Sequence, residues 1–365
     1  MDESLVRAWL TLLRAPGLGI NAIEQLLAHY PDPVAVVNAG AAACQVVPGL
    51  GEAARKALLQ PDEALIEGDL CWLERPGNHL VTRDHPHYPE LLREIPRPPM
   101  ALFVVGDPAR LALPQLAIVG SRNPTPAGAS AAHDFARHLA AGGFAVTSGL
   151  AIGIDAHAHQ GALDAKGVTV AVTGTGLDRV YPARNRDLAR HIAEGGVLVS
   201  EFPPGTAAKA SHFPMRNRII AGLSLGTLVV EAALRSGSLI TARMAGEYGR
   251  EIFAIPGSIH NPLARGCHAL IRQGAKLVET AGDIIEELGG MLSHVAQRVA
   301  TEARGVEPEG DEARVLQALG HDTLGIDELV GATGLTPAEL SSMLLTLELR
   351  GLVAPVAGGR YCRRV

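Results

Sequence analysis

Between residues 101 and 290, short apolar runs alternate with longer amphipathic stretches, and this alternation constrains the fold more than any other feature of the sequence. The apolar runs are short enough for strands, and several of them end in glycine. Alternating strands and helices are typical of a mostly parallel sheet with helices on both faces. We therefore predict an α/β protein with an extended Rossmann-like, doubly wound core. Its expected strands are 116–119, 145–147, 169–172, 197–200, 228–230 and 252–255, and its expected helices are 127–141, 154–165, 185–194, 214–223, 238–248 and 266–273.

Composition fits this fold and argues against other classes of protein. Hydrophobic residues make up 47% of the 365 residues and aromatic residues only 4%, with 41 glycines, which is not the composition of a disordered chain. The acidic start Met1–Ser4 precedes no signal-peptide pattern, and no apolar run approaches the length of a membrane span. The four cysteines lie far apart, so we expect no disulfide framework, no metal site and no cofactor, and a cytoplasmic protein.

The first 80 residues contain an internal repeat. The tetrapeptide Pro-Gly-Leu-Gly occurs at 16–19 and again at 48–51, and an apolar pattern of helical period follows each copy. This resembles tandem helix-hairpin-helix units, in which glycines permit a tight turn and backbone N–H groups at the helix start can hold a phosphate. Because the first 100 residues hold 8 basic and 13 acidic side chains, we favour hairpins that serve only for packing.

Further domain boundaries follow from local composition. A polar, proline-rich stretch at 81–115 indicates a connection into a core at 116–290, and a polar, acidic stretch indicates a linker at 291–310. Residues 311–365 show three helix-like runs and then a Gly358–Gly359 turn, which is the pattern of a winged helix. The third of these helices offers Glu339, Glu348 and a single Arg350. We therefore favour a structural or protein-contacting wing over one that reads the major groove.

Glycine-rich segments at the ends of the expected strands are candidate phosphate sites. Gly120–Arg122 ends the first core strand, where N–H groups, a hydroxyl and a guanidinium can all bind a phosphate. Ser236–Ser238 follows a later strand and opens a helix, so it forms a second anion cradle. The alternative for both segments is an ordinary strand–helix turn. For Asp155, beside a third glycine-rich segment, we expect a helix-capping role.

The densest cluster of candidate residues combines charge with an aromatic ring. Lys209 and Phe213 precede Arg216–Arg218, in which two arginines flank an asparagine near an expected helix start. Such a cluster can grip backbone phosphates while the phenylalanine stacks on a base, which is how single strands are usually held. The alternative is that the arginines form ion pairs with carboxylates at strand ends, such as Glu201 or Glu231.

The net charge of −6 does not exclude a nucleic-acid partner, because the charge is unevenly distributed. Residues 179–218 hold seven Lys and Arg side chains against three Asp and Glu. An acidic protein with such a segment can still present a basic strip on its central domain. For Arg186 and Arg190 within this window, a solvated helix face is an equal alternative.

Taken in order, these motifs resemble the DNA-processing protein A (DprA, also called Smf) family. The resemblance covers nearly the whole chain, and the ordered succession of segments makes it specific. The matching segments are Ala117–Arg122, Ser148–Ala151, Gly153–His157, Tyr181–Pro182 with Asn185, Ser200–Glu201, Phe213–Ser224, Ser236–Ala242, Gly249–Arg250 and Ile255–Gly257.

The resemblance implies a fold and a function. It implies a helical N-terminal domain, an extended Rossmann domain and a winged helix. It also implies a protein that binds single-stranded DNA, shields it from nucleases and loads the RecA recombinase onto it during natural transformation. A homodimer formed through the Rossmann domain and contact with single-strand-binding protein are further expectations. From the residue patterns and the resemblance together, the expected DNA-binding residues are Gly120, Ser121, Arg122, Arg184, Lys209, Phe213, Arg216, Asn217, Arg218, Ser236, Gly237 and Ser238.

The main alternative is an enzyme. The core is also similar to nucleotide phosphoribohydrolases of the lysine decarboxylase-like fold, whose Pro-Gly-Gly-x-Gly-Thr-x-x-Glu signature supplies a catalytic carboxylate. The nearest segment here has Thr241 where that glutamate would fall, and a threonine cannot act as a general base at neutral pH. Glu231 and Glu247 keep nucleotide hydrolysis open, but we expect a binding protein rather than an enzyme. A dehydrogenase is less expected, because no Gly-x-Gly-x-x-Gly follows the first core strand.

A protein-binding scaffold is the third alternative. In that case the basic strip is incidental, and the arginines at 122, 216 and 218 can become alanine without loss of DNA affinity.

Overall fold

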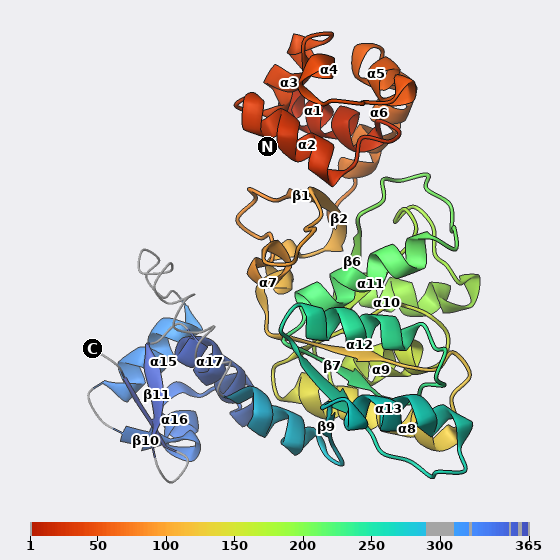
Figure 1. Ribbon diagram of the computed structural model, residues 1–365. Helices are drawn as coiled ribbons and strands as arrows, with labels where there is room; N and C mark the ends of the chain where they lie inside the picture. Colours follow the sequence, from red (N-terminus) through yellow and green to blue (C-terminus); the bar gives the residue numbers. More distant parts are fainter. Residues whose placement is uncertain (1, 290–309, 321–322, 350–351, 357–359, 364–365) are drawn as a thin grey trace. The chain divides into compact units, whose positions relative to one another are not determined.

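The computed structural model describes residues 2–289, 310–320, 323–349, 352–356 and 360–363, and the chain divides into two compact units, Met1–Glu279 and Thr280–Val365 (Figure 1). The first unit contains an N-terminal group of helices and a nine-stranded sheet with its own helices. The second contains a helix over 281–289 and a three-stranded sheet with three further helices. Within these described ranges, no helix is long and apolar enough to cross a membrane.

The N-terminal helices enclose an apolar core of their own. Trp9, Leu10 and Leu12 of α1 are buried together with Leu26 of α2. Trp72 of α6 joins the same cluster and meets Phe103 of the sheet edge to face, with ring centroids 6.0 Å apart. The helical group therefore packs directly on the sheet. Its helices are α1 (Glu3–Arg14), α2 (Ile20–His29), α3 (Pro33–Ala39), α4 (Ala43–Val46), α5 (Glu52–Leu59) and α6 (Glu63–Leu73).

The two Pro-Gly-Leu-Gly segments adopt the same local structure. Gly17 and Gly49 have φ angles of +81° and +75°, in the left-handed region that favours glycine. The final glycine of each copy is the N-cap of the helix that follows, α2 in the first copy and α5 in the second. Both copies therefore form the tight turn between helices that the repeat indicates.

The sheet of the first unit has the strand order β1-β2-β6-β5-β4-β3-β7-β8-β9. The strands from β3 to β9 run parallel to one another, whereas β1 and β2 are antiparallel at one edge. Ala117 at the centre of β3 lies opposite Thr147 of β4 and Thr227 of β7. The predicted doubly wound, mostly parallel sheet is confirmed. Its strands are β1 (Asn78–Thr82), β2 (Ala101–Gly106), β3 (Gln115–Val119), β4 (Ala145–Ser148), β5 (Thr169–Thr173), β6 (Val197–Ser200), β7 (Gly226–Val229), β8 (Glu251–Ala254) and β9 (Lys276–Leu277).

Two of these strands lie where the sequence indicates a connection. β2 and the end of β1 fall within 81–115, so part of this stretch belongs to the sheet. The first four residues of β2 are buried, because they are covered by the N-terminal helices on one side and by the main core on the other. The polar and proline-rich residues between the two strands obscure the strand pattern in the sequence.

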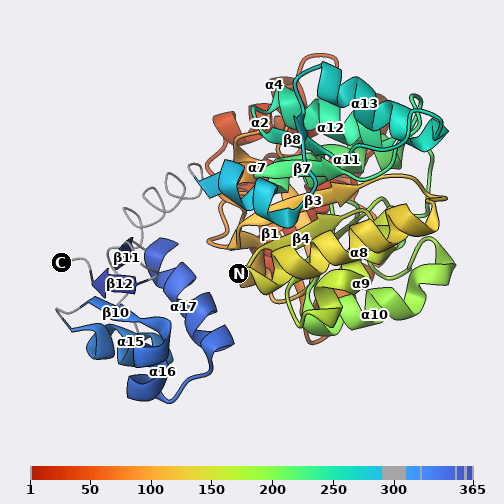
Figure 2. The same cartoon turned by 90° about the horizontal axis from the view of Figure 1, so that it is seen from below.

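The helices divide between the two faces of the sheet. Figure 2 shows α8, α9 and α10 on one face and α11, α12 and α13 on the other. Because the winding reverses between β3 and β7, their carboxyl ends form the switch point at which doubly wound sheets bind ligands. The helices are α7 (Glu90–Arg93), α8 (Pro126–Ala141), α9 (Ile154–Asp164), α10 (Arg186–Gly195), α11 (His212–Leu223), α12 (Ser238–Glu247) and α13 (Arg265–Arg272), with short 3-10 turns at Pro108–Ala112, Ala183–Asn185 and Pro262–Ala264.

The second unit is a winged helix, as predicted. Its core joins Leu316, Leu329 and Leu344 from its three helices with Val353 of its sheet. The expected Gly358–Gly359 turn, Arg350 and residues 291–309 of the expected linker lie outside the described residues. The helices are α15 (Asp311–Leu319), α16 (Ile326–Thr333) and α17 (Pro337–Leu349), and the strands, in sheet order β10-β12-β11, are β10 (Thr323–Gly325), β11 (Val353–Val356) and β12 (Arg360–Arg363).

Helices α8 and α9 pack closely and are joined by a histidine at their surface. A Cβ at Gly161 of α9 would overlap the carbonyl oxygen of His133 of α8, so only glycine permits this approach. The His133 Nε2 lies 2.8 Å from Asp164 Oδ2, and its Nδ1 lies 3.3 Å from Asp134 Oδ1. The hydrogen bond to Asp164, with the second carboxylate, raises the pKa of His133 above its ordinary value.

This contact predicts a pH-dependent contribution to stability. Because the folded-state pKa of His133 is raised, the contribution is complete below the ordinary histidine pKa of about 6.5 and is lost as pH rises through the folded-state value. We expect His133→Gln to lower the free energy of unfolding by about 0.5 kcal/mol at about pH 6, the size of a partly exposed pair, and by less at about pH 8.5. Urea denaturation at the two pH values measures the difference, with His191→Gln on α10 as the control. An equal loss at both pH values contradicts the prediction.

Candidate nucleic-acid interface

A cleft with a volume of about 720 Å³ lies at the switch point, at the carboxyl ends of β3 and β7. Its walls are the turn after β3, the turn that leads into α12, and the first turns of α11. The cleft brings together nine of the twelve residues expected to bind DNA. They are Gly120, Ser121, Arg122, Phe213, Arg216, Asn217, Ser236, Gly237 and Ser238.

Two further expected residues lie beside the cleft. Arg184 lines an adjoining hollow that shares Arg122 and Asn123 with the cleft. Lys209 is exposed on the loop before α11, next to Ala210, which does line the cleft. Both side chains therefore extend the cationic surface around the cleft without contributing to its walls.

Arg218 lies elsewhere. Its buried guanidinium forms an ion pair with Glu201 and donates a hydrogen bond of 2.6 Å to the carbonyl oxygen of Arg97. The ion-pair alternative therefore holds for Arg218. Side chains two residues apart on a helix are separated by about 200° around its axis, so Arg216 and Arg218 face opposite sides of α11.

Arg216 is buried at the base of the cleft, with only 5% of its surface exposed. A Cβ at Gly149 would overlap its Nη1, so the glycine at the end of β4 provides the space for the guanidinium. Its Nε has no hydrogen-bond partner among the described residues. Burial, with a smaller contribution from Arg122, lowers the pKa of Arg216 to about 10, so the group remains cationic at neutral pH.

Asp155 supports this arginine and does not cap a helix, so the predicted capping role is wrong. The N-cap of α9 is Gly153, and no side chain caps it. The Asp155 carboxylate instead accepts hydrogen bonds from the backbone N–H groups of Gly149 at 3.1 Å and Ala151 at 3.3 Å. These bonds hold a turn in which Leu150 has a φ of +56°. Burial raises the pKa of Asp155, while the nearby charge of Arg216 opposes that rise.

An aromatic surface lies beside these charges. The ring centroids of Phe213 and Tyr181 lie 5.5 Å apart. The Arg122 guanidinium lies 5.8 Å from the centroid of the Phe213 ring. Tyr181 is 50% exposed and was not among the expected site residues, although its place in a Tyr-Pro pair after a glycine-rich strand end could have drawn attention to it. Two rings and a cation together form a surface on which a base can stack.

The second cradle, Ser236–Ser238, forms the opposite wall. The Ser236 and Ser238 hydroxyls lie 2.7 Å apart, and α12 begins at Ser238. Asn217 reaches across from α11 and donates to the carbonyl oxygen of Gly237 at 3.4 Å. Arg235 also lines the cleft and is exposed, although it is not among the twelve residues expected from the sequence. Its position directly before the serine-glycine-serine segment is the pattern that could have identified it.

Glu231, one of the two carboxylates that keep the enzyme alternative open, already has hydrogen-bond partners within the protein. It accepts hydrogen bonds from the Thr125 backbone N–H at 2.9 Å, from the Thr125 hydroxyl at 2.7 Å, and from Asn261 at 3.4 Å. Thr125 in turn caps α8 through the N–H of Gly128. This buried carboxylate therefore ties the end of β7 to the start of α8. In the described part of the chain, no group of three or more His, Cys, Asp or Glu side chains could hold a metal ion.

Comparison with known proteins gives consistent matches. The family model for DNA recombination-mediator protein A matches residues 79–289, and the model for the DprA winged helix domain matches residues 299–359. Protein Smf of Escherichia coli (strain K12) is 45% identical over 300 residues, which cover 80% of each chain.

Two solved structures resemble the chain. The X-ray structure of DNA processing protein A from Streptococcus pneumoniae has a TM-score of 0.69 and 36% identity, and the match covers 77% of this chain and 97% of that one. A structure of DNA processing protein A from Helicobacter pylori, which concerns its unique single-stranded DNA binding mode, has a TM-score of 0.53 and 30% identity, and the match covers 58% and 97%.

The fit of Arg216 against Gly149 predicts a steric effect. We expect Gly149→Ala to displace the guanidinium and to lower the free energy of unfolding by about 1–3 kcal/mol, the usual cost of overpacking a core. The matched control is Gly237→Ala in the same cleft, where no atom lies within 4 Å of the added Cβ. We expect this control to remain within about 0.5 kcal/mol of the wild type. Urea denaturation of both variants measures the effect, and equal stabilities contradict the prediction.

Proposed function

The chain belongs to the DNA recombination-mediator protein A family, also called DprA or Smf, and on this premise we propose that its switch-point cleft binds single-stranded DNA. The proposal rests on one observation: the Arg122 and Arg216 cations line the same cleft as the ring of Phe213. A positive groove beside an aromatic surface is the arrangement that holds single strands irrespective of sequence. The binding mode named for the Helicobacter pylori relative agrees with it.

In the proposed complex, phosphates and bases meet different parts of the cleft. The Arg122 guanidinium and the Ser236–Ser238 turn hold phosphates, since both lie on the walls and carry donors. A base stacks on Phe213 beside Tyr181. Few base edges are read, so affinity depends on the phosphate charge and falls steeply with salt.

Family membership supports the wider role. We propose that the bound strand is protected from nucleases and passed to the RecA recombinase during natural transformation and recombination. The protein acts in the cytoplasm as a homodimer, with single-strand-binding protein as a further partner. The Glu231 carboxylate favours this binding role over nucleotide hydrolysis, because its oxygens already accept hydrogen bonds from Thr125 and Asn261 and so join the end of β7 to the start of α8.

The arginine on the cleft wall gives the first test of binding. We expect Arg122→Ala to weaken binding of an unstructured single-stranded oligonucleotide and to reduce the salt slope of the affinity by about 1, as for one lost phosphate contact. Fluorescence anisotropy at several salt concentrations measures both quantities. The control is Arg190→Ala, an exposed arginine on α10 paired with Asp187 and outside the cleft. If a folded wild-type protein binds no single strand, the proposal fails and nucleoside monophosphates become the ligands to screen for hydrolysis.

The aromatic ring gives a separate test of stacking. We expect Phe213→Ala to cost about 1–3 kcal/mol of single-strand affinity, the value of one stacked base, whereas Phe213→Tyr retains most of it. Because the bases of a duplex are already stacked on each other, the alanine variant should lose little of any duplex affinity. Anisotropy titrations of the three proteins with single-stranded and duplex oligonucleotides make this comparison. Equal wild-type affinity for the two DNA forms would refute stacking on Phe213.

A further inference from the structure

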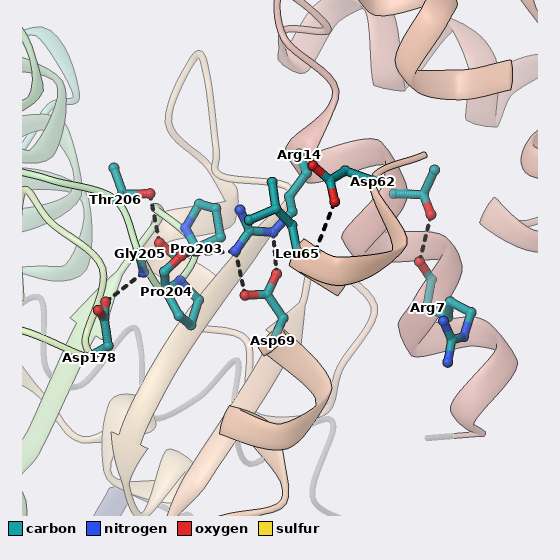
Figure 3. Close-up of polar contacts among 11 residues, drawn as sticks. Arg7, Arg14, Asp62, Leu65, Asp69, Asp178, Pro203, Pro204, Gly205 and Thr206 are labelled. Atoms are coloured by element: carbon teal, nitrogen blue, oxygen red, sulfur yellow. Dashed lines mark hydrogen bonds and ion pairs between the residues drawn. The ribbon is translucent and has the colours of Figure 1, made fainter. Parts of the chain in front are cut away.

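Arg14, in the last turn of α1, contacts both the N-terminal helices and the core of the first unit (Figure 3). Its Nε donates to Asp69 Oδ2 and its Nη2 to Asp69 Oδ1, both at 2.5 Å, so the two side chains form a bidentate ion pair between α1 and α6. The same Nη2 donates a third hydrogen bond, of 2.9 Å, to the carbonyl oxygen of Pro204. Pro204 lies in the loop between β6 and α11, so one guanidinium joins two helices to a loop of the core.

The ion pair is not needed to hold α1 against α6. Asp69 is 1% exposed, and burying two charges costs nearly as much as their attraction returns, so apolar side chains can serve the same packing. The internal repeat offers a comparison. Arg14 lies two residues before the first Pro-Gly-Leu-Gly, and the residue in the same place before the second copy is the apolar Val46. Val46 packs against the apolar core of the same helices. What the arginine adds is the bond to Pro204.

The bonded part of that loop is also held from its other side. The Gly205 N–H donates to Asp178 Oδ1 at 2.7 Å (Figure 3). The Gly176 N–H donates to the carbonyl oxygen of Thr206 at 3.0 Å. The Thr206 hydroxyl closes the turn on the carbonyl oxygen of Pro203 at 2.7 Å. Residues 203–206 therefore sit between the loop after β5 and the end of α1, with anchors on both sides.

The second half of the same loop is exposed and leads to the cleft. Every residue from 207 to 211 is exposed, including Lys209, and Phe213 follows in the first turn of α11. An exposed segment of this kind takes its position from the anchored residues before it. The third bond of Arg14 thus acts on the chain that presents a cation and an aromatic ring to the proposed DNA strand.

We propose that Arg14 is a positioning residue for DNA binding, through which the N-terminal helices hold the 203–206 turn and thereby place the loop that carries Lys209. The proposal rests on the proposed single-strand binding by the cleft. Through Arg14, the N-terminal helices then influence the affinity for single-stranded DNA without contacting the DNA themselves.

The test replaces the ion pair without leaving a buried charge. In Arg14→Leu/Asp69→Leu, apolar side chains keep α1 packed on α6 while the bond to Pro204 is lost. We expect single-strand affinity to fall about fivefold, a modest coupling between separate sites, in anisotropy titrations. We also expect trypsin to cleave after Lys209 about fivefold faster, because a released loop opens locally more often, with the site identified by fragment mass. Should this variant not fold, Arg14→Lys is used, which keeps the charge opposite Asp69 but lacks the second nitrogen for Pro204.

The matched control removes the other ion pair between the same helices. Arg7 lies two turns earlier on α1 and pairs with Glu67 at 2.7 Å and Glu63 at 3.0 Å, both from α6 (Figure 3 shows Arg7). Arg7→Leu/Glu67→Leu is expected to keep the wild-type affinity and cleavage rate. If the Arg14 variant is folded and matches this control in both measurements, the proposal is overturned. If the wild type binds no single strand but cleavage after Lys209 still accelerates, the proposed function fails while the coupling stands.

Discussion

The burial of two guanidinium groups on α11 is the constraint on which the cleft depends. Arg216 fits against Gly149 on one side of the helix, and Arg218 pairs with Glu201 on the other. A rotation of α11 about its axis would remove Arg216 from the space that Gly149 leaves and would separate Arg218 from Glu201, and breaking a buried ion pair costs several kcal/mol. The helix is therefore fixed in rotation by two opposed groups. Its first turn, with Phe213, is held in one orientation above the cleft as a result.

A second constraint joins the walls of the cleft to each other. Glu231 at the end of β7 holds Thr125 at the start of α8, so the turn after β3 cannot separate from the turn after β7. Glu231, one of the two carboxylates that keep nucleotide hydrolysis open, thus has a structural role. The cleft is lined by the cations Arg122, Arg216 and Arg235, by serine hydroxyls, by the ring of Phe213 and by the carboxylate of Asp155 beside Arg216. Cations beside an aromatic ring can bind a polyanion whose bases stack, whereas Thr241 stands in the position of the hydrolase glutamate.

The sequence predicts the core well and the roles of single residues less well. Strands and helices from β3 to α13 agree within about two residues, because buried strands and amphipathic helices leave a clear periodic pattern. β1 and β2 were missed because they pair antiparallel at the sheet edge, within polar and proline-rich surroundings. The separate positions of Arg216 and Arg218 follow from helical phase, yet which of them faces the cleft depends on how α11 packs. The bond from Arg14 to Pro204 spans 190 residues and leaves no local pattern at all.

The distribution of charge explains how an acidic chain can carry this site. Asp69 and Asp178 lie on either side of the 203–206 turn, close enough for each charge to raise the other's energy. Both are compensated, Asp69 by Arg14 and Asp178 by Arg179 and the Gly205 N–H. Because each of these carboxylates is paired with an arginine, neither leaves an unpaired negative charge beside the turn that leads to Lys209.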